Sequence, residues 1–383
     1  MKYLALALAL VLSAATTVGA TTWHVAQDGS GDFEIIQDAV DAAEPGDTIH
    51  IHAGRYLNVT DDWDLYGDGT ILLDVHVVIT KDNLTLQGDG PDITMIGPES
   101  IPPGADPNYV GISVCYNEAT TLTIRDLAVE GVRYGVNGAS PFLSVAGCRF
   151  GEVGNGVWLQ DADGQAVVSR CSFLNCGSGV HGIHDSDNIE VNRCIFENCS
   201  LATVFVGNEG VVVDGCEFVG GLGAIDLQQE SSGIVSDCTF RDVLVVGVST
   251  SLGGIVDIRR CVFDGGNQAI SITGFGGSHV EECTFSSQFF TAASYSSNDA
   301  NVLFDCNIYN GGQWSVYCEA SGDCYLDMRG NYWGTDDEAQ IQAWIYDAND
   351  DSNLNCTVDY IPFSSVVSIE QKSWSEVKGL FRE

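Results

Sequence analysis

One short phrase, Cys-x-Phe, recurs along the middle of this chain at a fixed interval. Isoleucine replaces phenylalanine in the last copy. The eight copies are Cys148/Phe150, Cys171/Phe173, Cys194/Phe196, Cys216/Phe218, Cys238/Phe240, Cys261/Phe263, Cys283/Phe285 and Cys306/Ile308. Successive cysteines lie 22 or 23 residues apart, and an apolar residue stands three places before each of them. A fixed period of this length indicates one supersecondary unit stacked on copies of itself.

Within one unit, apolar and polar residues alternate. Leu143, Val145, Cys148 and Phe150 are separated by more polar residues, which predicts strands. The alternation slips by one residue between Val145 and Cys148, so we expect the chain to bend there. A loop with glycine or asparagine and a third short strand follow. A helix of about ten residues does not fit into such a unit. Three short strands per unit, stacked in parallel about 4.8 Å apart, form a solenoid.

This repeat resembles the right-handed parallel β-helix of the pectate-lyase-like superfamily, in which asparagine often occupies the bend. Cysteine takes that place here in eight coils, and asparagine returns at Asn331 in the phrase Gly-Asn-Tyr-Trp-Gly. The resemblance covers roughly residues 22–363. It implies an all-β, single-stranded solenoid of about ten or more coils, with a short N-terminal capping helix and a helical and stranded C-terminal cap. It does not imply one activity, because this fold hosts many functions.

The sequence divides into four segments. We expect a signal peptide at 1–20, an N-terminal cap with the first strands at 21–72, the β-helix at 73–335, and a C-terminal cap with an amphipathic tail at 336–383. Within the caps, we expect helices at 33–43 (capped by Asp32), 337–346 and 373–381, and a closing strand at 358–361. The amphipathic last helix would pack on the stack or on a partner.

The first twenty residues have the pattern of a secretory signal, with Lys2, an apolar run and small residues before Ala20. The apolar run is too short to span a bilayer, and no later stretch qualifies. We therefore expect a secreted, periplasmic or cell-surface protein without membrane insertion, and a monomer.

The chain is strongly acidic. Its formal net charge is −38, with 15 lysines and arginines against 53 acidic residues. This disfavours nucleic acid as a partner, because the basic footprint is missing. Two explanations of the charge remain: a solubilising coat for a long stack, or calcium binding. Several arginines gather near the bend, where they either relieve acidic repulsion or hold carboxylates.

The spacing of the cysteines predicts which of them are free thiols and which could form a disulfide. Equivalent positions in stacked coils point the same way, with their Cβ atoms about 4.8 Å apart, which exceeds the usual disulfide distance. We therefore interpret the eight repeat cysteines as buried thiols, and Cys176 and Cys199 as a second stacked pair. Cys318 and Cys324 flank a short loop and are the best candidates for a disulfide. Metal binding by the buried thiols is the less favoured alternative.

Enzymes of the superfamily usually work on the outer face of one sheet and on the loops beside it. The register places on that face Asn137, Trp158, Gln160, His181, Val204, Val206, Asp226, Gln228, Thr250, Ser271, Thr273 and Tyr295. The aromatic rings would stack on sugar rings, and the polar groups would bind hydroxyls. We therefore expect a polysaccharide to contact Trp158, Gln160, His181, Asp226, Gln228 and Tyr295. The alternative is an ordinary mixed outer face.

Catalysis would need an acid–base pair on this face. His181 and Asp226 lie two coils apart, about 10 Å by strand spacing, and His184 and Asp185 follow nearby. This distance slightly exceeds the separation of about 6.5–9.5 Å in inverting glycosidases. The catalytic phrases of pectin methylesterases, polygalacturonases and pectate lyases are absent. The sequence also has no P-loop, dinucleotide fingerprint, zinc spacing or serine nucleophile elbow.

One acidic loop has the opening spacing of a calcium site. Asp347, Asn349, Asp351 and Asn353 match the first ligands of an EF-hand-type loop. The match then fails, because Ser352 stands in place of glycine and Val358 in place of the bidentate glutamate. Calcium therefore remains a weak candidate cofactor, and the acidic stretch 61–68 is a looser alternative.

These features favour an exported β-helix protein that binds carbohydrate or serves as a structural surface module. The rival hypothesis is a polysaccharide lyase, epimerase or glycosidase that uses the face around His181 and Asp226. A third hypothesis is a periplasmic accessory protein like the copper-associated members of the superfamily, and the burial of the cysteines argues against metal delivery.

Overall fold

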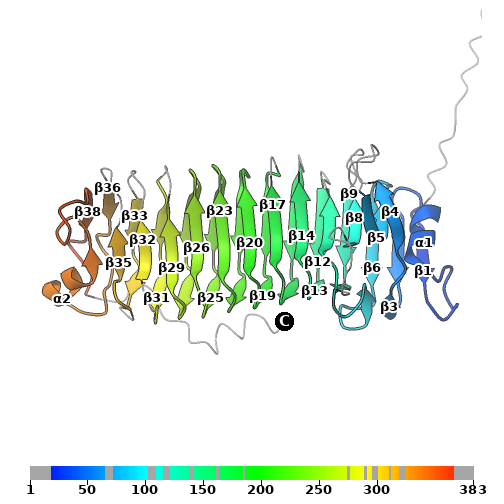
Figure 1. Ribbon diagram of the computed structural model, residues 1–383, viewed down its shortest axis with the longest axis horizontal. Coiled ribbons are helices and arrows are strands. Elements are labelled where there is room, and N and C mark those ends of the chain that lie inside the picture. Colours follow the sequence, from blue (N-terminus) through cyan, green and yellow to red (C-terminus); the bar gives the residue numbers. More distant parts are fainter. Residues whose placement is uncertain are drawn as a thin grey trace, which may run out of the picture.

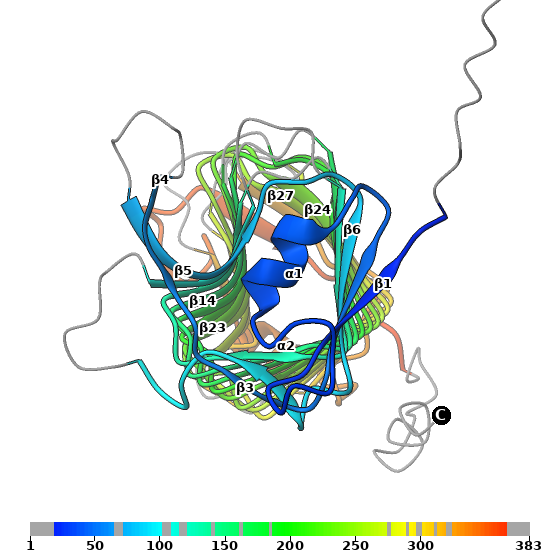
Figure 2. The same ribbon diagram turned by 90° about the vertical axis from the view of Figure 1, so that its right-hand side faces the viewer.

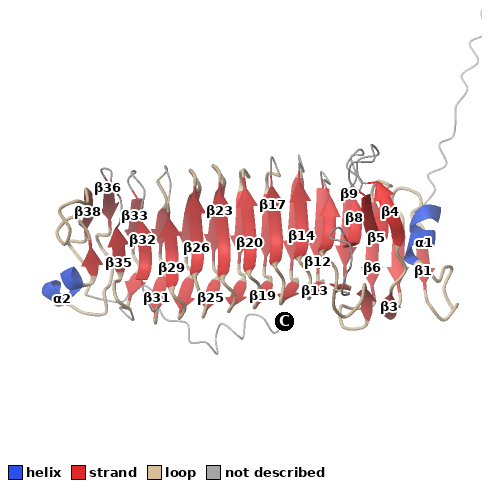
Figure 3. Ribbon diagram, viewed as in Figure 1, coloured by secondary structure: helices blue, strands red, loops and turns tan. Residues whose placement is uncertain are grey.

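The protein is a long stack of coils, each made of short strands that lie in three parallel sheets (Figures 1 and 2). The computed structural model describes residues 19–64, 72–101, 109–114, 121–138, 142–160, 164–183, 186–273, 277–288, 291–295, 301–309, 312–318 and 324–365. Several predicted features lie outside these residues: nearly all of the expected signal peptide, half of the acidic stretch 61–68, His184, Asp185 and the expected helix at 373–381. Figure 3 shows that strands dominate the described chain.

Each coil of the repeat region gives one strand to each of the three sheets. Sheet 1 runs in the order β1 (Thr22–Val25), β2 (Thr48–Ile51), β6 (Leu84–Gly88), β9 (Thr121–Arg125), β12 (Phe142–Ala146), β15 (Gln165–Ser169), β18 (Ile189–Asn192), β21 (Val211–Asp214), β24 (Ser232–Ser236), β27 (Ile255–Arg259), β30 (His279–Glu281), β33 (Asn301–Phe304), β36 (Cys324–Asp327) and β38 (Cys356–Asp359). Sheet 2 contains β3 (Gly54–Tyr56), β7 (Thr94–Ile96), β10 (Ala128–Glu130), β13 (Arg149–Gly151), β16 (Ser172–Leu174), β19 (Ile195–Glu197), β22 (Glu217–Val219), β25 (Thr239–Arg241), β28 (Val262–Asp264), β31 (Thr284–Ser286) and β34 (Asn307–Ile308).

Sheet 3 carries the face that the sequence analysis singled out. It contains β4 (Thr60–Asp64), β5 (Leu72–Ile79), β8 (Tyr109–Val114), β11 (Tyr134–Gly138), β14 (Asn155–Gln160), β17 (Ser178–Ile183), β20 (Leu201–Val206), β23 (Gly223–Gln228), β26 (Val246–Ser251), β29 (Gln268–Ile272), β32 (Thr291–Tyr295), β35 (Val316–Cys318) and β37 (Ile345–Tyr346). Its neighbouring strands pair in parallel, except that β4 pairs antiparallel with β5. The parallel solenoid predicted from the repeat is confirmed.

The bend before each repeat cysteine has a backbone cause. The residue that precedes the cysteine takes the left-handed conformation in all eight coils, at Gly147, Arg170, Arg193, Gly215, Asp237, Arg260, Glu282 and Asp305. This conformation costs non-glycine residues of order 1–3 kcal/mol, so neighbouring contacts must hold it. It turns the chain from sheet 1 into sheet 2 and explains why the alternation slips by one residue there.

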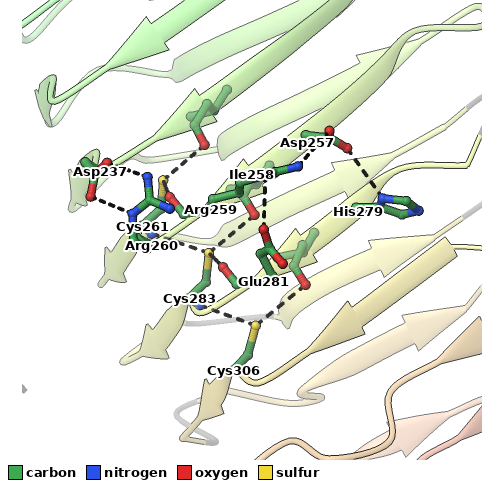
Figure 4. A network of polar contacts seen from close by, with 12 residues as sticks. Asp237, Asp257, Ile258, Arg259, Arg260, Cys261, His279, Glu281, Cys283 and Cys306 are labelled. Atoms are coloured by element: carbon green, nitrogen blue, oxygen red, sulfur yellow. Dashed lines mark hydrogen bonds and ion pairs between the residues drawn. The ribbon is translucent and has the colours of Figure 1, made fainter. Parts of the chain in front are cut away.

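The cysteines at this bend form a buried ladder, which we call the cysteine ladder (Cys148, Cys171, Cys194, Cys216, Cys238, Cys261, Cys283 and Cys306). All eight are at most 2% exposed, which confirms the predicted burial. The Cys283 thiol donates to the carbonyl oxygen of Glu281 at 3.2 Å, and its sulfur accepts the backbone N–H of Cys261 at 3.4 Å (Figure 4). Burial raises the pKa of the Cys171 thiol. The ladder thiols donate to backbone carbonyl oxygens, so they act as hydrogen-bonding groups as well as small apolar ones.

At the end of the ladder, an asparagine makes the hydrogen bonds to the backbone that the cysteines make in the other coils. The Asn331 side chain is fully buried and accepts the backbone N–H of Cys306 at 2.8 Å. Its amide donates to the carbonyl oxygens of Leu303 and Met328, both at 2.7 Å. The thiols thus stand in for the asparagine ladder that the resemblance implied.

A stack of phenylalanine rings fills the interior beside the ladder. Seven rings, from Phe150 to Phe285, lie with neighbouring centroids 4.4–5.1 Å apart and planes within 7°. Small residues of sheet 3 face these rings. A Cβ at Gly156 would lie 2.5 Å from the ring of Phe173, so a larger residue would not fit there. The coil repeat therefore depends on a large residue and a small residue that face each other across the core.

Helices close both ends of the stack, with bounds that differ from those predicted. Figure 2 shows α1 (Ile36–Ala42) across the N-terminal opening. Asp32 does not cap it, because its carboxylate accepts the backbone N–H of His24 at 2.9 Å, and the cap residue Ile35 has no side-chain hydrogen bond. The prediction of Asp32 as the cap is therefore wrong, and the predicted helix is present but begins at Ile36.

At the C-terminal end, α2 (Glu338–Ala343) begins after Asp337, whose carboxylate accepts the N–H groups of Ala339 and Gln340. The closing strand β38 begins two residues before the predicted start, because Cys356 pairs in register with Cys324 of β36. Cys318 is buried on β35. The side chain of Cys324 lies outside the described residues, so the disulfide remains a prediction. No helix in the described part of the chain is long and apolar enough to span a membrane.

Candidate functional site

The outer face of sheet 3 presents one row of side chains along the stack, which we call the outer row. Register pairs connect its members from coil to coil. They are Ser113, Asn137, Trp158, His181, Val204, Asp226, Ser249 and Ser271. Parallel strands lie about 4.8 Å apart, so Trp158 and His181 are direct neighbours while His181 and Asp226 are separated by the coil of Val204.

A second row lies two residues further along each strand. It contains Gln160, Ile183, Val206, Gln228 and Ser251. Gln160 and Gln228 are both half-buried. The structure thus confirms the outward placement of Trp158, Gln160, His181, Asp226 and Gln228, although it does not test whether they bind anything.

Two predicted members of the face lie in the wrong row. Thr250 pairs with Leu227 and is 1% exposed, and Ser249 takes its place in the outer row. Tyr295 pairs with Ile272 and Cys318, which are both buried, so its position belongs to the inward row. The cause is the variable length of the coils, because one extra residue between a phenylalanine and the next strand moves the residues of that strand to the other face.

Aromatic rings cluster at one end of the outer row. The ring of Trp158 lies edge-on to Tyr134, with centroids 5.5 Å apart, and 4.4 Å from the imidazole of His181. Trp158 and His181 are both half-buried. The packing on both sides holds the indole in one orientation and leaves part of it open to solvent, which is the geometry that a stacking ligand needs.

His181 is a weak candidate for proton transfer. Its Nδ1 is buried and has no hydrogen-bond partner. Burial lowers the pKa of His181 to about 4. The imidazole is therefore neutral near pH 7, where it would be a poor general acid, and a base with this pKa has little driving force.

Asp226 is held by neutral partners. One carboxylate oxygen accepts the Gln228 amide at 2.5 Å, and the other accepts the Ser249 hydroxyl at 2.9 Å. Val204, which is 4% exposed, occupies the coil between His181 and Asp226. The two predicted catalytic residues therefore make no contact. Asp226 is also the one carboxylate in the described parts of the two outer rows, so the pair of acids that most glycosidases use is not found there.

The predicted calcium ligands act as turn residues. The Asp347 carboxylate is buried and accepts the backbone N–H groups of Asn349 at 2.9 Å and Val358 at 3.3 Å. Asp351 accepts both the backbone and the side-chain N–H of Asn353. These hydrogen bonds do not test whether the loop binds calcium, so calcium binding by Asp347, Asn349, Asp351 and Asn353 remains a prediction.

Arginines on the acidic stack pair with acids of neighbouring coils. Arg260 binds both oxygens of Asp237 at 3.0 and 2.7 Å (Figure 4), and Glu130 contacts Arg55 and Arg149, each at 2.8 Å. These contacts agree with the interpretation that the arginines relieve acidic repulsion.

Two features escaped the sequence reasoning. An open hollow of about 520 Å³ lies on the outer face of sheet 1, lined by Phe142, Gln165, Glu190 and Val212 among others. Three histidines, His24, His50 and His52, gather near the N-terminal cap. In the sequence, His50 and His52 are separated by one residue, a spacing that predicts that both side chains lie on one face. Only the register of β1 against β2 shows that His24 lies beside them.

The comparisons with known proteins concern the fold. A sequence profile described as a right-handed beta helix region matches residues 130–285. No curated protein matches the chain. Among solved structures, the catalytic unit of a thermostable GH87 alpha-1,3-glucanase from Streptomyces thermodiastaticus is 15% identical, with a TM-score of 0.49, and the match covers 87% of this chain and 67% of that one.

Two further structures are similar at the same low level of identity. A variant of the catalytic domain of GH87 alpha-1,3-glucanase in complex with nigerose is 12% identical (TM-score 0.47), and the match covers 85% of this chain and 66% of that chain. Pectin methylesterase from carrot is 14% identical (TM-score 0.28), with 90% and 89% covered. The register of the coils and the matching profile together show that the fold is a right-handed parallel β-helix.

Proposed function

We propose that this protein is an exported carbohydrate-binding module whose ligand lies along the outer row of sheet 3 and is not cleaved there. One observation carries the proposal: Trp158 is fixed between Tyr134 and His181 and stands in register with Asp226 three coils away. Sugar rings stack on an indole face, while the Asp226 carboxylate, Gln228 amide and Ser249 hydroxyl offer the mixed donors and acceptors that sugar hydroxyls need.

The charge of the protein indicates which class of glycan the face would bind. The described members of the two outer rows include no lysine or arginine, and the whole chain carries a formal net charge of −38. An anionic polysaccharide would be repelled over the whole stack, apart from screening by salt. A neutral glycan is therefore the ligand class that this face suits best.

The absence of turnover follows from the same contacts. His181 is neutral near pH 7, and Asp226 is hydrogen-bonded to neutral groups and separated from His181 by Val204. Neither residue has a partner that would prepare it for proton transfer across a glycosidic bond. Among the described residues of this face, the rival hypothesis of a lyase, epimerase or hydrolase thus lacks the pair of groups that it needs.

A glycan array with the purified protein, followed by calorimetry on the best ligand, tests the proposal. Trp158→Ala should weaken binding by about tenfold or more, since a lost stacking contact and its buried area are worth about 1–2 kcal/mol, with little change in melting temperature. Phe142→Ala is the matched control, because Phe142 is 56% exposed on sheet 1 and lines the hollow there.

Loss of glycan affinity in Phe142→Ala, with unchanged affinity in Trp158→Ala, would instead place the binding site on sheet 1. Assays for reducing ends and for unsaturated products, run on every glycan bound, check the absence of cleavage. Turnover that disappears in His181→Ala would overturn the non-catalytic proposal and favour the enzyme.

A further inference from the structure

A cluster of three histidines lies on the outer face of sheet 1, at the N-terminal end of the stack. His24 is on β1, His50 is on β2, and His52 follows directly after β2. Because His24 and His50 are register partners in the parallel pair, their side chains project from the same face. His52 is two residues beyond His50 and projects to that face as well.

The three imidazoles are close enough to share one ion. One ring nitrogen from each histidine lies within 4.8 Å of the other two. His24 Nδ1 and His52 Nε2 are 3.1 Å apart. Two imidazole nitrogens bound to one tetrahedral zinc ion stand about 3.4 Å apart, given Zn–N bonds of about 2.0–2.1 Å. Small side-chain rotations would therefore convert the cluster into a coordination site.

A carboxylate from the next coil orients two of the rings. Asp89, which directly follows β6, lies 2.7 Å from His50 Nε2 and 3.2 Å from His52 Nδ1, and it accepts the backbone N–H of Ala53 at 3.0 Å. These contacts fix the orientation of the His50 and His52 imidazoles relative to the rest of the cluster.

We propose that His24, His50 and His52 bind one divalent transition-metal ion, with Zn²⁺ as the reference ion, and that Asp89 is a positioning residue for His50 and His52. Neutral imidazoles are ligands for zinc, copper and nickel, and a carboxylate behind a ligating histidine is a recurrent feature of metal sites. The side chains of His50 and His52 are 26% and 37% exposed, so an ion has access from solvent. Three protein ligands leave a fourth position open to water.

The ion would also stabilise the cap of the stack. β1 is the end strand of sheet 1, with β2 as its neighbouring strand. A metal bound to His24, His50 and His52 joins β1 to β2, and Asp89 connects both to the following coil. Any ligand that binds the folded state alone raises the melting temperature, so the ion is expected to do so here.

The test uses the full chain without a histidine tag, first treated with chelator and then titrated with ZnCl₂ by calorimetry. We expect one ion per chain with a Kd in the micromolar range or below, a higher melting temperature with zinc, and weaker binding at pH 5.5 than at pH 7.5, because histidine ligands must be deprotonated. Substitution with Co²⁺ should give intense visible absorption bands, which indicate four-coordinate geometry.

Single variants locate the site. His24→Ala, His50→Ala and His52→Ala should each lower zinc affinity by tenfold or more, and Asp89→Asn should lower it by about 10–100-fold. The control is His279→Ala, because His279 is exposed on the same sheet beside Asp257 and does not belong to the cluster. Circular dichroism shows whether each variant is folded, and His24→Gln replaces His24→Ala if the latter is not.

Two results would overturn the proposal. One is the absence of stoichiometric zinc binding by the wild-type protein. The other is wild-type zinc affinity in the folded histidine variants, or an equal loss in His279→Ala. Either would leave the three histidines as a hydrogen-bonded cluster that Asp89 organises.

Discussion

The substitution Val213→Asp tests the inward register of the stack against its closest control, Asp214→Val. Val213 is 0% exposed and pairs with Val191 and Val235, which are also buried. Asp214, the next residue, is half-buried and accepts the Ser236 hydroxyl at 2.6 Å. The two changes exchange the same residue types at neighbouring positions that face opposite sides of one strand.

The expected cost follows from three contributions. Protonation of the introduced carboxyl at pH 7, from an ordinary pKa near 3.9, costs about 4 kcal/mol. Burial of the neutral acid without a hydrogen-bond partner costs about 1–3 kcal/mol, and loss of the buried valine costs about 1.5–3 kcal/mol. The sum is about 7–10 kcal/mol, which is comparable to the whole stability of many domains. Asp214→Val loses one hydrogen bond, worth about 0.5–1.5 kcal/mol.

The pH dependence gives Val213→Asp a signature of its own. The pKa of the introduced carboxyl is raised in the folded state, so the folded protein binds the proton more strongly than the unfolded chain does. The penalty is therefore smallest below about pH 4 and grows as the pH rises, by about 1.4 kcal/mol per unit.

Urea unfolding, followed by circular dichroism at pH 7 and at pH 4.5 with the wild-type protein at each pH, measures both effects. Equal free energies of unfolding for Val213→Asp and Asp214→Val at pH 7 would refute the register. If the decrease in the free energy of unfolding of Val213→Asp is no smaller at pH 4.5 than at pH 7, the introduced carboxyl is not buried.

Three further predictions concern the ladder and the outer face. The cysteine ladder should react with a thiol reagent only after denaturation, and rapid native labelling of most of its members would contradict the burial. Asn331→Leu should destabilise the protein by about 3 kcal/mol or more, because it removes three buried hydrogen bonds, whereas Asn331→Cys, which copies the ladder, should cost about half as much in urea unfolding. His181 has its pKa lowered to about 4 by burial, so its contribution to stability is complete above about pH 6.5 and is lost as the pH falls toward 4. The melting temperature of His181→Gln should therefore decline less than that of the wild type over this range, and parallel curves would show that another group is responsible.

Much of the fold could be predicted from the sequence because its information is local and repeated. Each coil repeats the same pattern of apolar and polar residues. The inward residues and the bend before each cysteine follow from the period of two, and the parallel stacking follows from the period of 22 or 23 residues. Val145, Cys148 and Phe150 are buried as this pattern indicates. The same argument correctly placed Trp158, His181 and Asp226 on the outer face, because their coils keep a constant length between the phenylalanine and the next strand.

The tertiary structure alone decided what depends on exact register and on contacts between distant residues. One residue of extra length moved Thr250 to the inward row, and a strand period of two makes such an error complete. Asp32 was expected to cap a helix, but its position beside the N–H of His24 gave it another partner. His24 lies 26 residues before His50 in the sequence, and Asp89 lies in the following coil. Only the parallel pairing of β1, β2 and β6 brings these residues into one cluster, because sequence spacing carries no information on which distant coils become neighbours until the register is known.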